Sequence, residues 1–219
     1  METLIKEMVS TYGAQTLYDR KNAMKEAMQE MVLCGLSRAE FFKKAAFYGG
    51  TALRIFYGLD RFSEDLDFSL LQPDSAFDLA TYFPVLEKEV KAFGLNVEIR
   101  SREKVKESPI QSAFLKGNTL EHLLLFYPEA TTDIAVPKNE IVKIKFEVDV
   151  QPPRYATFER KYRLQPVPYE VNLYDEPSLF AGKIHAVLGR SWKNRIKGRD
   201  LYDYVFYLAH NVAVNLPHL

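Results

Sequence analysis

The sequence predicts an α+β protein in which a helical N-terminal segment leads into a mixed sheet and two helices end the chain. Apolar residues recur at three- and four-residue spacing near both ends, a period typical of helices. Between these ends lie short apolar or alternating runs bounded by glycine and proline, which indicate strands. We therefore expect a helical lead-in (residues 1–44), a sheet-bearing core (residues 45–174) and a C-terminal helical segment (residues 175–219) that completes the functional site.

The individual elements follow from local patterns. In the lead-in, Met24 and Met28 mark one helical face, and Ser37 with Glu40 matches a capping box. The rest of the chain is expected to form, in order, a strand at 45–48, a glycine turn at 49–50, a helix at 51–57, a strand at 65–70, a helix at 75–93, strands at 95–100, 120–126 and 141–150, an irregular connection rich in proline and basic residues at 151–174, and helices at 176–190 and 198–210.

Composition limits where the protein acts and what it binds. Basic and acidic residues both number 29, so the formal net charge is zero and any site for a polyanion must be local. The single cysteine, Cys34, excludes an internal disulfide, and its place in an apolar run predicts burial. The N-terminus lacks the apolar core of a signal peptide, and no stretch approaches the roughly 20 apolar residues of a membrane helix. We expect a cytoplasmic protein that does not enter the membrane.

Two aspartates carry the first sign of chemistry. Asp65 and Asp67 are two residues apart on an expected strand, so both side chains leave the same face of the sheet. Carboxylates this close repel each other unless a cation lies between them, and oxygen-only ligands favour Mg²⁺. A D-x-D pattern alone is common on protein surfaces, so its neighbours decide its meaning.

The neighbours of the two aspartates favour a phosphate site. Gly49 and Gly50 lie between a strand and a helix, where they allow close backbone approach, and the first amides of a helix that begins near Thr51 point toward any anion there. The Thr51 hydroxyl adds a donor. In two-metal phosphoryl transfer, backbone amides bind the phosphates, and metal ions connect the phosphates to two carboxylates. This segment contains the residues for both contacts.

A third carboxylate is expected on a neighbouring strand. Alternation over residues 144–149 places Lys145, Glu147 and Asp149 on one face of that strand. Either carboxylate can complete a metal site, and we favour Glu147 over Asp149. The alternative is a half-exposed strand with a charged solvent face.

Four segments resemble a known family. GGTALR at residues 49–54 and RFSEDLDF at residues 61–68 resemble the first motif of the AbiEii/AbiGii family of type IV toxin nucleotidyltransferases, within the polymerase-β-like superfamily. AGKIHA at residues 181–186 and KGRDLYD at residues 197–203 are similar to the later motifs of that family. The middle third of the chain matches only loosely, at Lys145 and Glu147.

The resemblance implies a polymerase-β-like core that uses Mg²⁺, expected as two ions, to transfer a nucleoside monophosphate from an NTP to an acceptor. In studied relatives the acceptor is the end of a tRNA, and a partner antitoxin restrains toxicity. This chain ends soon after the last motif, whereas many relatives continue into further helices.

The resemblance also assigns roles by position. Asp65, Asp67 and Glu147 would bind metal, and Lys183 would contact the triphosphate. Asp200 is assigned to catalysis and Asp203 to the nucleotide site, although the two positions can exchange roles. The remaining expected nucleotide contacts are Gly49, Gly50, Thr51, Arg54, Arg61, Ser63 and Lys145.

The last helix has two faces with different predicted roles. The expected apolar stripe comprises Leu201, Tyr204, Val205 and Leu208. Asp200, Asp203 and Tyr207 fall on another face, which either looks into the functional site or is a solvated acidic face. Lys183 likewise is either a surface lysine or a cation that reaches the site.

A tryptophan in the segment before the last helix is a further candidate for nucleic-acid contact. Trp192 can stack on a base, with nearby cations for the phosphate backbone, or it can belong to a solvated loop. The cations around it are Arg190, Lys193, Arg195 and Lys197.

Two further functions stay open. The chain can be a nucleotidyltransferase that modifies a small molecule or a protein side chain, which the neutral net charge permits. It can also be a degenerate paralogue that binds nucleotides without turnover. The sequence names neither the NTP nor the acceptor.

Overall fold

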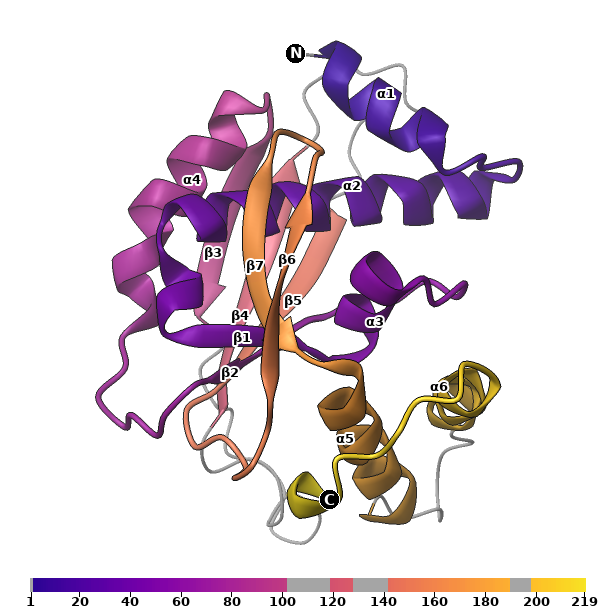
Figure 1. Ribbon diagram of the computed structural model, residues 1–219. Helices are drawn as coiled ribbons and strands as arrows, with labels where there is room; N and C mark the ends of the chain where they lie inside the picture. Colours follow the sequence, from indigo (N-terminus) through magenta and orange to yellow (C-terminus); the bar gives the residue numbers. More distant parts are fainter. Residues whose placement is uncertain (1, 102–118, 128–141, 190–197) are drawn as a thin grey trace, which may run out of the picture.

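The structure, a computed structural model, describes residues 2–101, 119–127, 142–189 and 198–219 (Figure 1). A seven-stranded mixed sheet has the strand order β3-β4-β5-β2-β1-β7-β6. The strands are β1 (Ala45–Tyr48), β2 (Leu66–Leu70), β3 (Asn96–Ser101), β4 (Thr119–Tyr127), β5 (Val142–Asp149), β6 (Phe158–Arg163) and β7 (Tyr169–Tyr174). The helices are α1 (Glu2–Thr11), α2 (Leu17–Arg38), α3 (Gly49–Tyr57), α4 (Phe83–Ala92), α5 (Glu176–Gly189) and α6 (Gly198–Ala209), with 3-10 turns η1 (Phe41–Lys43), η2 (Leu79–Tyr82) and η3 (Leu216–His218). The predicted fold class, a mixed sheet with helices before and after it, is confirmed.

The register of the three central strands aligns polar residues across the sheet. β2 runs antiparallel to β1 and parallel to β5, and Asp67 pairs with Tyr48 on one side and Glu147 on the other. Residues paired directly across strands project from the same face. Tyr48, Asp67 and Glu147 therefore share one face, and Ser69 and Asp149, two pairs further along, project from the same face.

The opposite face carries the larger hydrophobic core. Phe47, Phe68 and Phe146 project from three adjacent strands, and Phe41 of η1 packs edge-on against Phe68 with ring centroids 5.1 Å apart. The helices α2 and α4 pack against each other and cover this core. Cys34 of α2 is fully buried there, as predicted.

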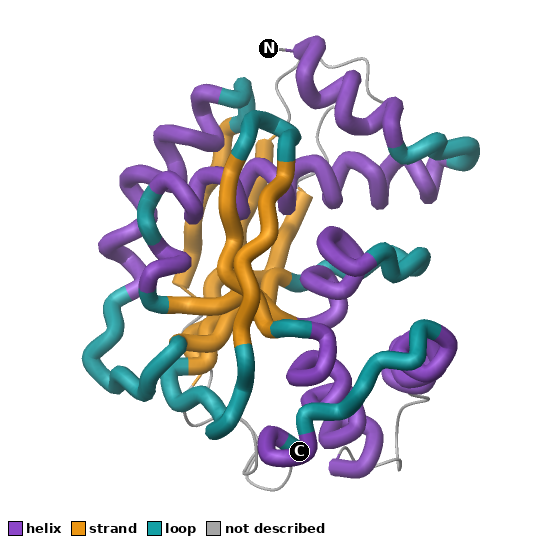
Figure 2. The backbone as a smooth tube through the Cα atoms, in the orientation of Figure 1, coloured by secondary structure: helices purple, strands orange, loops and turns teal. Residues whose placement is uncertain are grey.

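A smaller core lies under α3, α5 and α6 on the face that carries Asp67. It contains Leu53 of α3, Tyr174 of β7 and the stacked rings of Phe180 and Tyr207, whose centroids are 4.7 Å apart. Figure 2 shows α5 and α6 grouped at the lower right, away from α1, α2 and α4 above. The C-terminal helices are thus attached to the same side of the sheet as the central polar residues.

Two predicted elements are wrong in extent. The helix expected at residues 75–93 is instead η2 followed by α4, because the Asp78 side chain caps the amide of Ala80 and Pro84 belongs in a first helical turn. The helix α2 continues to Arg38, and its capping box is formed by Thr16 and Asp19 rather than by Ser37 and Glu40.

The connection expected at residues 151–174 is also wrong, because it contains the hairpin β6–β7 at the edge of the sheet. The β6 strand alternates between exposed and half-buried residues. Because it is rich in charge, this alternation does not appear as an alternation of apolar and polar residues in the sequence. The three-region division of the chain stays a prediction. None of the helices in the described ranges is long and apolar enough to cross a membrane.

Phe41→Ala should lower the free energy of unfolding by about 3–5 kcal/mol, since it empties a fully buried aromatic site between the sheet and the helices. Denaturant unfolding measures this change. Tyr18→Ala, at an exposed aromatic side chain, is the control and should change the free energy by less than about 0.5 kcal/mol. Equal effects of the two substitutions would contradict the assignment of the core.

Candidate active site

A glycine corner joins β1 to α3. The helix begins at Gly49, two residues before the predicted start, and Gly49 has a φ of +82°. A Cβ atom on Gly49 would lie 2.6 Å from Oδ2 of Asp67, and one on Gly50 would lie 2.9 Å from Oγ of Ser63. Both glycines therefore let the chain pass directly against the acidic segment.

Three carboxylates meet beside this corner. Asp67 lies in β2, Glu147 lies opposite it in β5, and Asp65 directly precedes β2 rather than lying within it as predicted. Burial, together with the charges of Glu147 and Asp65 and a hydrogen bond with Glu147, raises the pKa of Asp67 to about 7. Burial also raises the pKa of Asp65. The three carboxylates therefore repel one another when they are ionised, and a bound cation would reduce this repulsion.

Lys145 supplies positive charge to this group. It forms an ion pair with Glu147 and opposes the upward pKa shifts of Asp65 and Asp67. Asp149 lies two pairs further along, opposite Ser69, and its Oδ1 accepts a hydrogen bond of 2.9 Å from the amide of Gln151. Of these two carboxylates of β5, Glu147 is thus the one that lies opposite Asp67. Among the described residues, no group of three or more His, Cys, Asp or Glu side chains meets the arrangement of a metal site.

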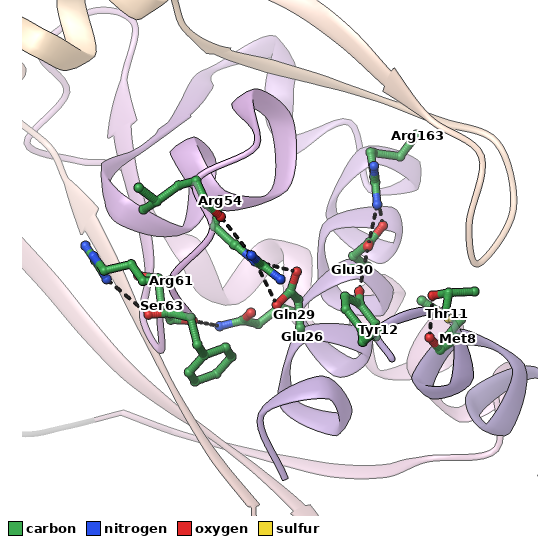
Figure 3. Close-up of polar contacts among 12 residues, drawn as sticks. Met8, Thr11, Tyr12, Glu26, Gln29, Glu30, Arg54, Arg61, Ser63 and Arg163 are labelled. Carbon is green, nitrogen blue, oxygen red and sulfur yellow. Dashed lines mark hydrogen bonds and ion pairs between the residues drawn. The ribbon is translucent and has the colours of Figure 1, made fainter. Parts of the chain in front are cut away.

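The segment before Asp65 is held by side chains rather than by strand pairing (Figure 3). Thr51 donates to the carbonyl of Asp65 at 2.5 Å, and Arg54 donates to the carbonyl of Leu59 at 2.8 Å. Further donors are Gln29, to the carbonyls of Ser63 (3.0 Å) and Glu64 (2.9 Å), and Arg61, to the carbonyl of Phe62 (3.0 Å). We call residues 59–65 the acidic loop.

Two residues expected to contact the nucleotide, Thr51 and Arg54, bind other parts of the protein in this structure. The side chain of Thr51 is fully buried, and its hydroxyl is bound to the acidic loop. Arg54 also pairs with Glu26 of α2 through contacts of 3.1 and 3.2 Å. Both residues thus brace the acidic loop, and their contact with a nucleotide stays a prediction.

A second charged cluster joins α5, α6 and the acidic loop. Nζ of Lys183 lies 3.0 Å from Oδ1 of Asp200 and 2.8 Å from Oδ2 of Asp203. Arg61 makes two hydrogen bonds of 2.6 Å to the carboxylate of Asp203, which is fully buried. The guanidinium also lies near Gly50, so consecutive contacts connect the glycine corner to Lys183.

The burial of this cluster decides between the two predicted roles of the acidic face of α6, because that face is turned inward and is not solvated. Asp200, Asp203 and Tyr207 are buried, whereas Leu201, Val205 and Leu208 are 41%, 59% and 52% exposed. The expected apolar stripe is therefore wrong, because paired charges turn the acidic face inward. The charge of Arg199, at the start of α6, slightly opposes the rise in the pKa of Asp65 that burial causes. Trp192 and the cations around it lie outside the described residues.

The lead-in contributes functional contacts that the sequence did not reveal. Glu26, Gln29 and Glu30 are buried polar residues in an otherwise apolar stretch of α2. Buried polar side chains need hydrogen-bond partners, so three polar residues in an apolar stretch of a helix could have indicated contacts to other parts of the chain. The sequence does not show which partners these residues contact.

A sequence profile described as the nucleotidyl transferase AbiEii toxin of type IV toxin–antitoxin systems matches residues 32–218. The chain belongs to this AbiEii family. It is accordingly a nucleotidyltransferase, and the matched span includes the glycine corner, the carboxylates and Lys183.

Two solved structures resemble this AbiEii chain. A proposed nucleotidyltransferase from H. pylori aligns at 20% identity with a TM-score of 0.50, over 85% of this chain and 67% of that chain. JHP933 from Helicobacter pylori aligns at 20% identity with a TM-score of 0.53, over 87% and 67%. At this identity the likeness shows the fold alone. No curated protein matches the sequence.

Gly49→Ala should impair this AbiEii enzyme more than Gly58→Ala does. Both glycines have φ above +80°, so alanine strains the backbone at either position by roughly 1–3 kcal/mol. Only the Gly49 methyl group would collide with Asp67, whereas no atom lies within 4 Å of one at Gly58. We expect both variants to melt earlier and only Gly49→Ala to lose nucleotidyl transfer, by about a hundredfold. Equal transfer by the two variants would count against the close contact.

Asp67→Asn should stabilise the metal-free protein, and more at pH 8 than at pH 5. The pKa of Asp67 is about 7 in the folded protein and 3.8 ordinarily, so the unfolded chain loses this proton more easily. As the pH rises from 3.8 to 7, Asp67 therefore destabilises the fold increasingly, and asparagine removes this effect. Melting in EDTA should occur at least about 3 °C higher for the variant at pH 8. Asp78→Asn, which keeps its capping oxygen, is the control. A lower melting temperature for Asp67→Asn at pH 8 would refute the predicted charge strain.

Proposed function

We propose that this chain is the toxin of a type IV system and transfers a nucleoside monophosphate from an NTP to RNA, such as the acceptor end of a tRNA. The observation that carries the proposal is the meeting of Asp65, Asp67 and Glu147 beside the glycine corner. The reaction would take place in the cytoplasm, and a cognate antitoxin is the expected partner in the family.

The carboxylates fit a divalent cation by their chemistry. Asp67 and Glu147 share a hydrogen bond, and the raised pKa of Asp67 reflects its burial first and then the negative charges of Glu147 and Asp65. Oxygen donors of this kind suit Mg²⁺. We propose Asp65 and Asp67 as ligands with Glu147 as the third carboxylate. When bound, two Mg²⁺ ions would polarise the phosphate and assist both the attacking and the leaving oxygen.

Residues of the chain would bind and orient the nucleotide. The first amides of α3, at Gly49 and Gly50, have no partner within the helix and suit a phosphate oxygen. Lys183 would contact the triphosphate, which then competes with Asp200 and Asp203 for the ammonium group. Lys183 would therefore exchange its aspartate partners for the triphosphate when the nucleotide binds.

The two aspartates of α6 would divide their roles. Asp203 is fully buried and forms ion pairs with both Arg61 and Lys183, so we propose that it positions these two cations. Asp200 has a partly accessible side chain beside Lys183 and is the better candidate for contact with reacting groups. Ser63, next to Gly50, and Lys145, next to Glu147, remain proposed nucleotide contacts.

Incubation with each α-³²P-labelled NTP and Mg²⁺, with total RNA in one arm and total protein in the other, tests the proposal. We expect label in RNA, with a preference for one NTP. Label in protein alone would refute the RNA acceptor and favour modification of a side chain. Magnesium-NTP binding without labelling in either arm would favour a degenerate paralogue.

Asp65→Asn combined with Asp67→Asn should lower the rate of transfer at least about a thousandfold, because both proposed metal ligands lose their charge. The rate of label incorporation into RNA measures the loss. Asp78→Asn changes an acidic residue outside the site and should retain the wild-type rate. Wild-type transfer by the double variant would rule out the proposed role of these aspartates.

A further inference from the structure

The buried polar row of α2 reaches three different parts of the protein. Glu26 pairs with Arg54 of α3, and Glu30 pairs with Arg163 of β6 at 2.7 Å. Gln29 lies between them and is fully buried. Its side-chain nitrogen donates to the carbonyl of Ser63 (Figure 3). It also donates to the carbonyl of Glu64, the residue directly before Asp65.

The amide of Gln29 serves this contact as a donor. Both carbonyls face its nitrogen, and the opposite orientation would place its oxygen against two other oxygens. Its own Oε1 is buried and finds no hydrogen-bond partner in the described part of the chain. An unsatisfied buried acceptor destabilises a fold, so the two donated bonds must offset this loss.

The two bonds attach the acidic loop to α2, in addition to its attachment to α3. Thr51 holds the carbonyl of Asp65, while Gln29 holds the two carbonyls before it. Three successive peptide groups are thereby anchored where the chain turns into β2. The side chain of Ser63 is thus kept at Gly50, and the carboxylate of Asp65 is kept beside Asp67.

We infer that Gln29 is a positioning residue for nucleotidyl transfer, which it supports by fixing the acidic loop that presents Asp65. This inference rests on the proposed function of the carboxylates. Gln29 lies before residues 32–218, the span that matches the AbiEii family. The lead-in helix α2 is therefore part of the active-site architecture and more than a cover for the core.

Two substitutions separate hydrogen bonding from packing. Gln29→Met keeps the length of the side chain and removes both donors, whereas Gln29→Glu keeps its shape and turns oxygen toward two carbonyls. Tyr12→Phe is the matched control, because it removes a 3.1 Å hydrogen bond to Glu30 on the same helix without touching the acidic loop. For each protein we would measure kcat and KM with the four labelled NTPs and total RNA, amide hydrogen exchange, and the melting temperature.

We expect Gln29→Met to lower kcat about a hundredfold with KM for the NTP within about threefold, and Gln29→Glu to lower kcat further. Amide exchange should accelerate at least about tenfold within residues 61–66 and stay near the wild-type rate elsewhere. Tyr12→Phe should keep the wild-type kcat and the wild-type exchange rate of residues 61–66. This should hold even if its melting temperature falls as much as that of Gln29→Met.

Unchanged kcat or unchanged exchange of residues 61–66 in Gln29→Met would overturn the inference. Uniformly faster exchange, or failure of both Gln29 variants to fold, would reduce the residue to a structural role and overturn it as well. A wild-type protein without transfer would refute the proposed function instead. Exchange of the acidic loop would still show whether Gln29 holds it.

Discussion

The acidic loop between α3 and β2 has no strand beside it, so side chains must satisfy its carbonyl groups. Five carbonyls, at residues 59 and 62–65, accept hydrogen bonds from side chains. A buried carbonyl without a partner costs roughly 1–3 kcal/mol, so each donor helps to fix the path of the loop. The donors Thr51 and Arg54 belong to the glycine motif itself, which therefore encodes both the corner and the support of Asp65.

Charge is balanced locally in a chain whose formal net charge is zero. Lys145 partly compensates the carboxylates of the sheet, and Arg61 with Lys183 compensates Asp200 and Asp203. In the proposed function, a triphosphate and its cations would enter the site by exchanging these partners. The same balance explains why α6 turns its aspartates inward and leaves Leu201 and Val205 exposed.

The sequence predicted the central elements well, because β1, β2 and β5 are short apolar or alternating runs, and the alternation places Glu147 on the charged face of β5. The pairing of Asp67 with Glu147 required the structure, since the period of a strand does not set its register. It failed where a local pattern was ambiguous: Pro84 starts a helix in the middle of a helical period, and β6 is charged on both faces. It left the acidic face of α6 open between an inward and a solvated position, since the amphipathic pattern alone does not show that cations pair with Asp200 and Asp203. The role of Gln29 required coordinates, because its partners lie more than thirty positions away.

Anomalous diffraction from crystals grown with Mn²⁺ tests the central claim most directly, since it locates the cation and the acidic loop together. The account predicts a manganese peak bound by carboxylate oxygens of both Asp65 and Asp67, with Gln29 still bonded to the two carbonyls before Asp65. Manganese bound only elsewhere on the protein, or Asp65 turned to the other face of the sheet, would contradict it.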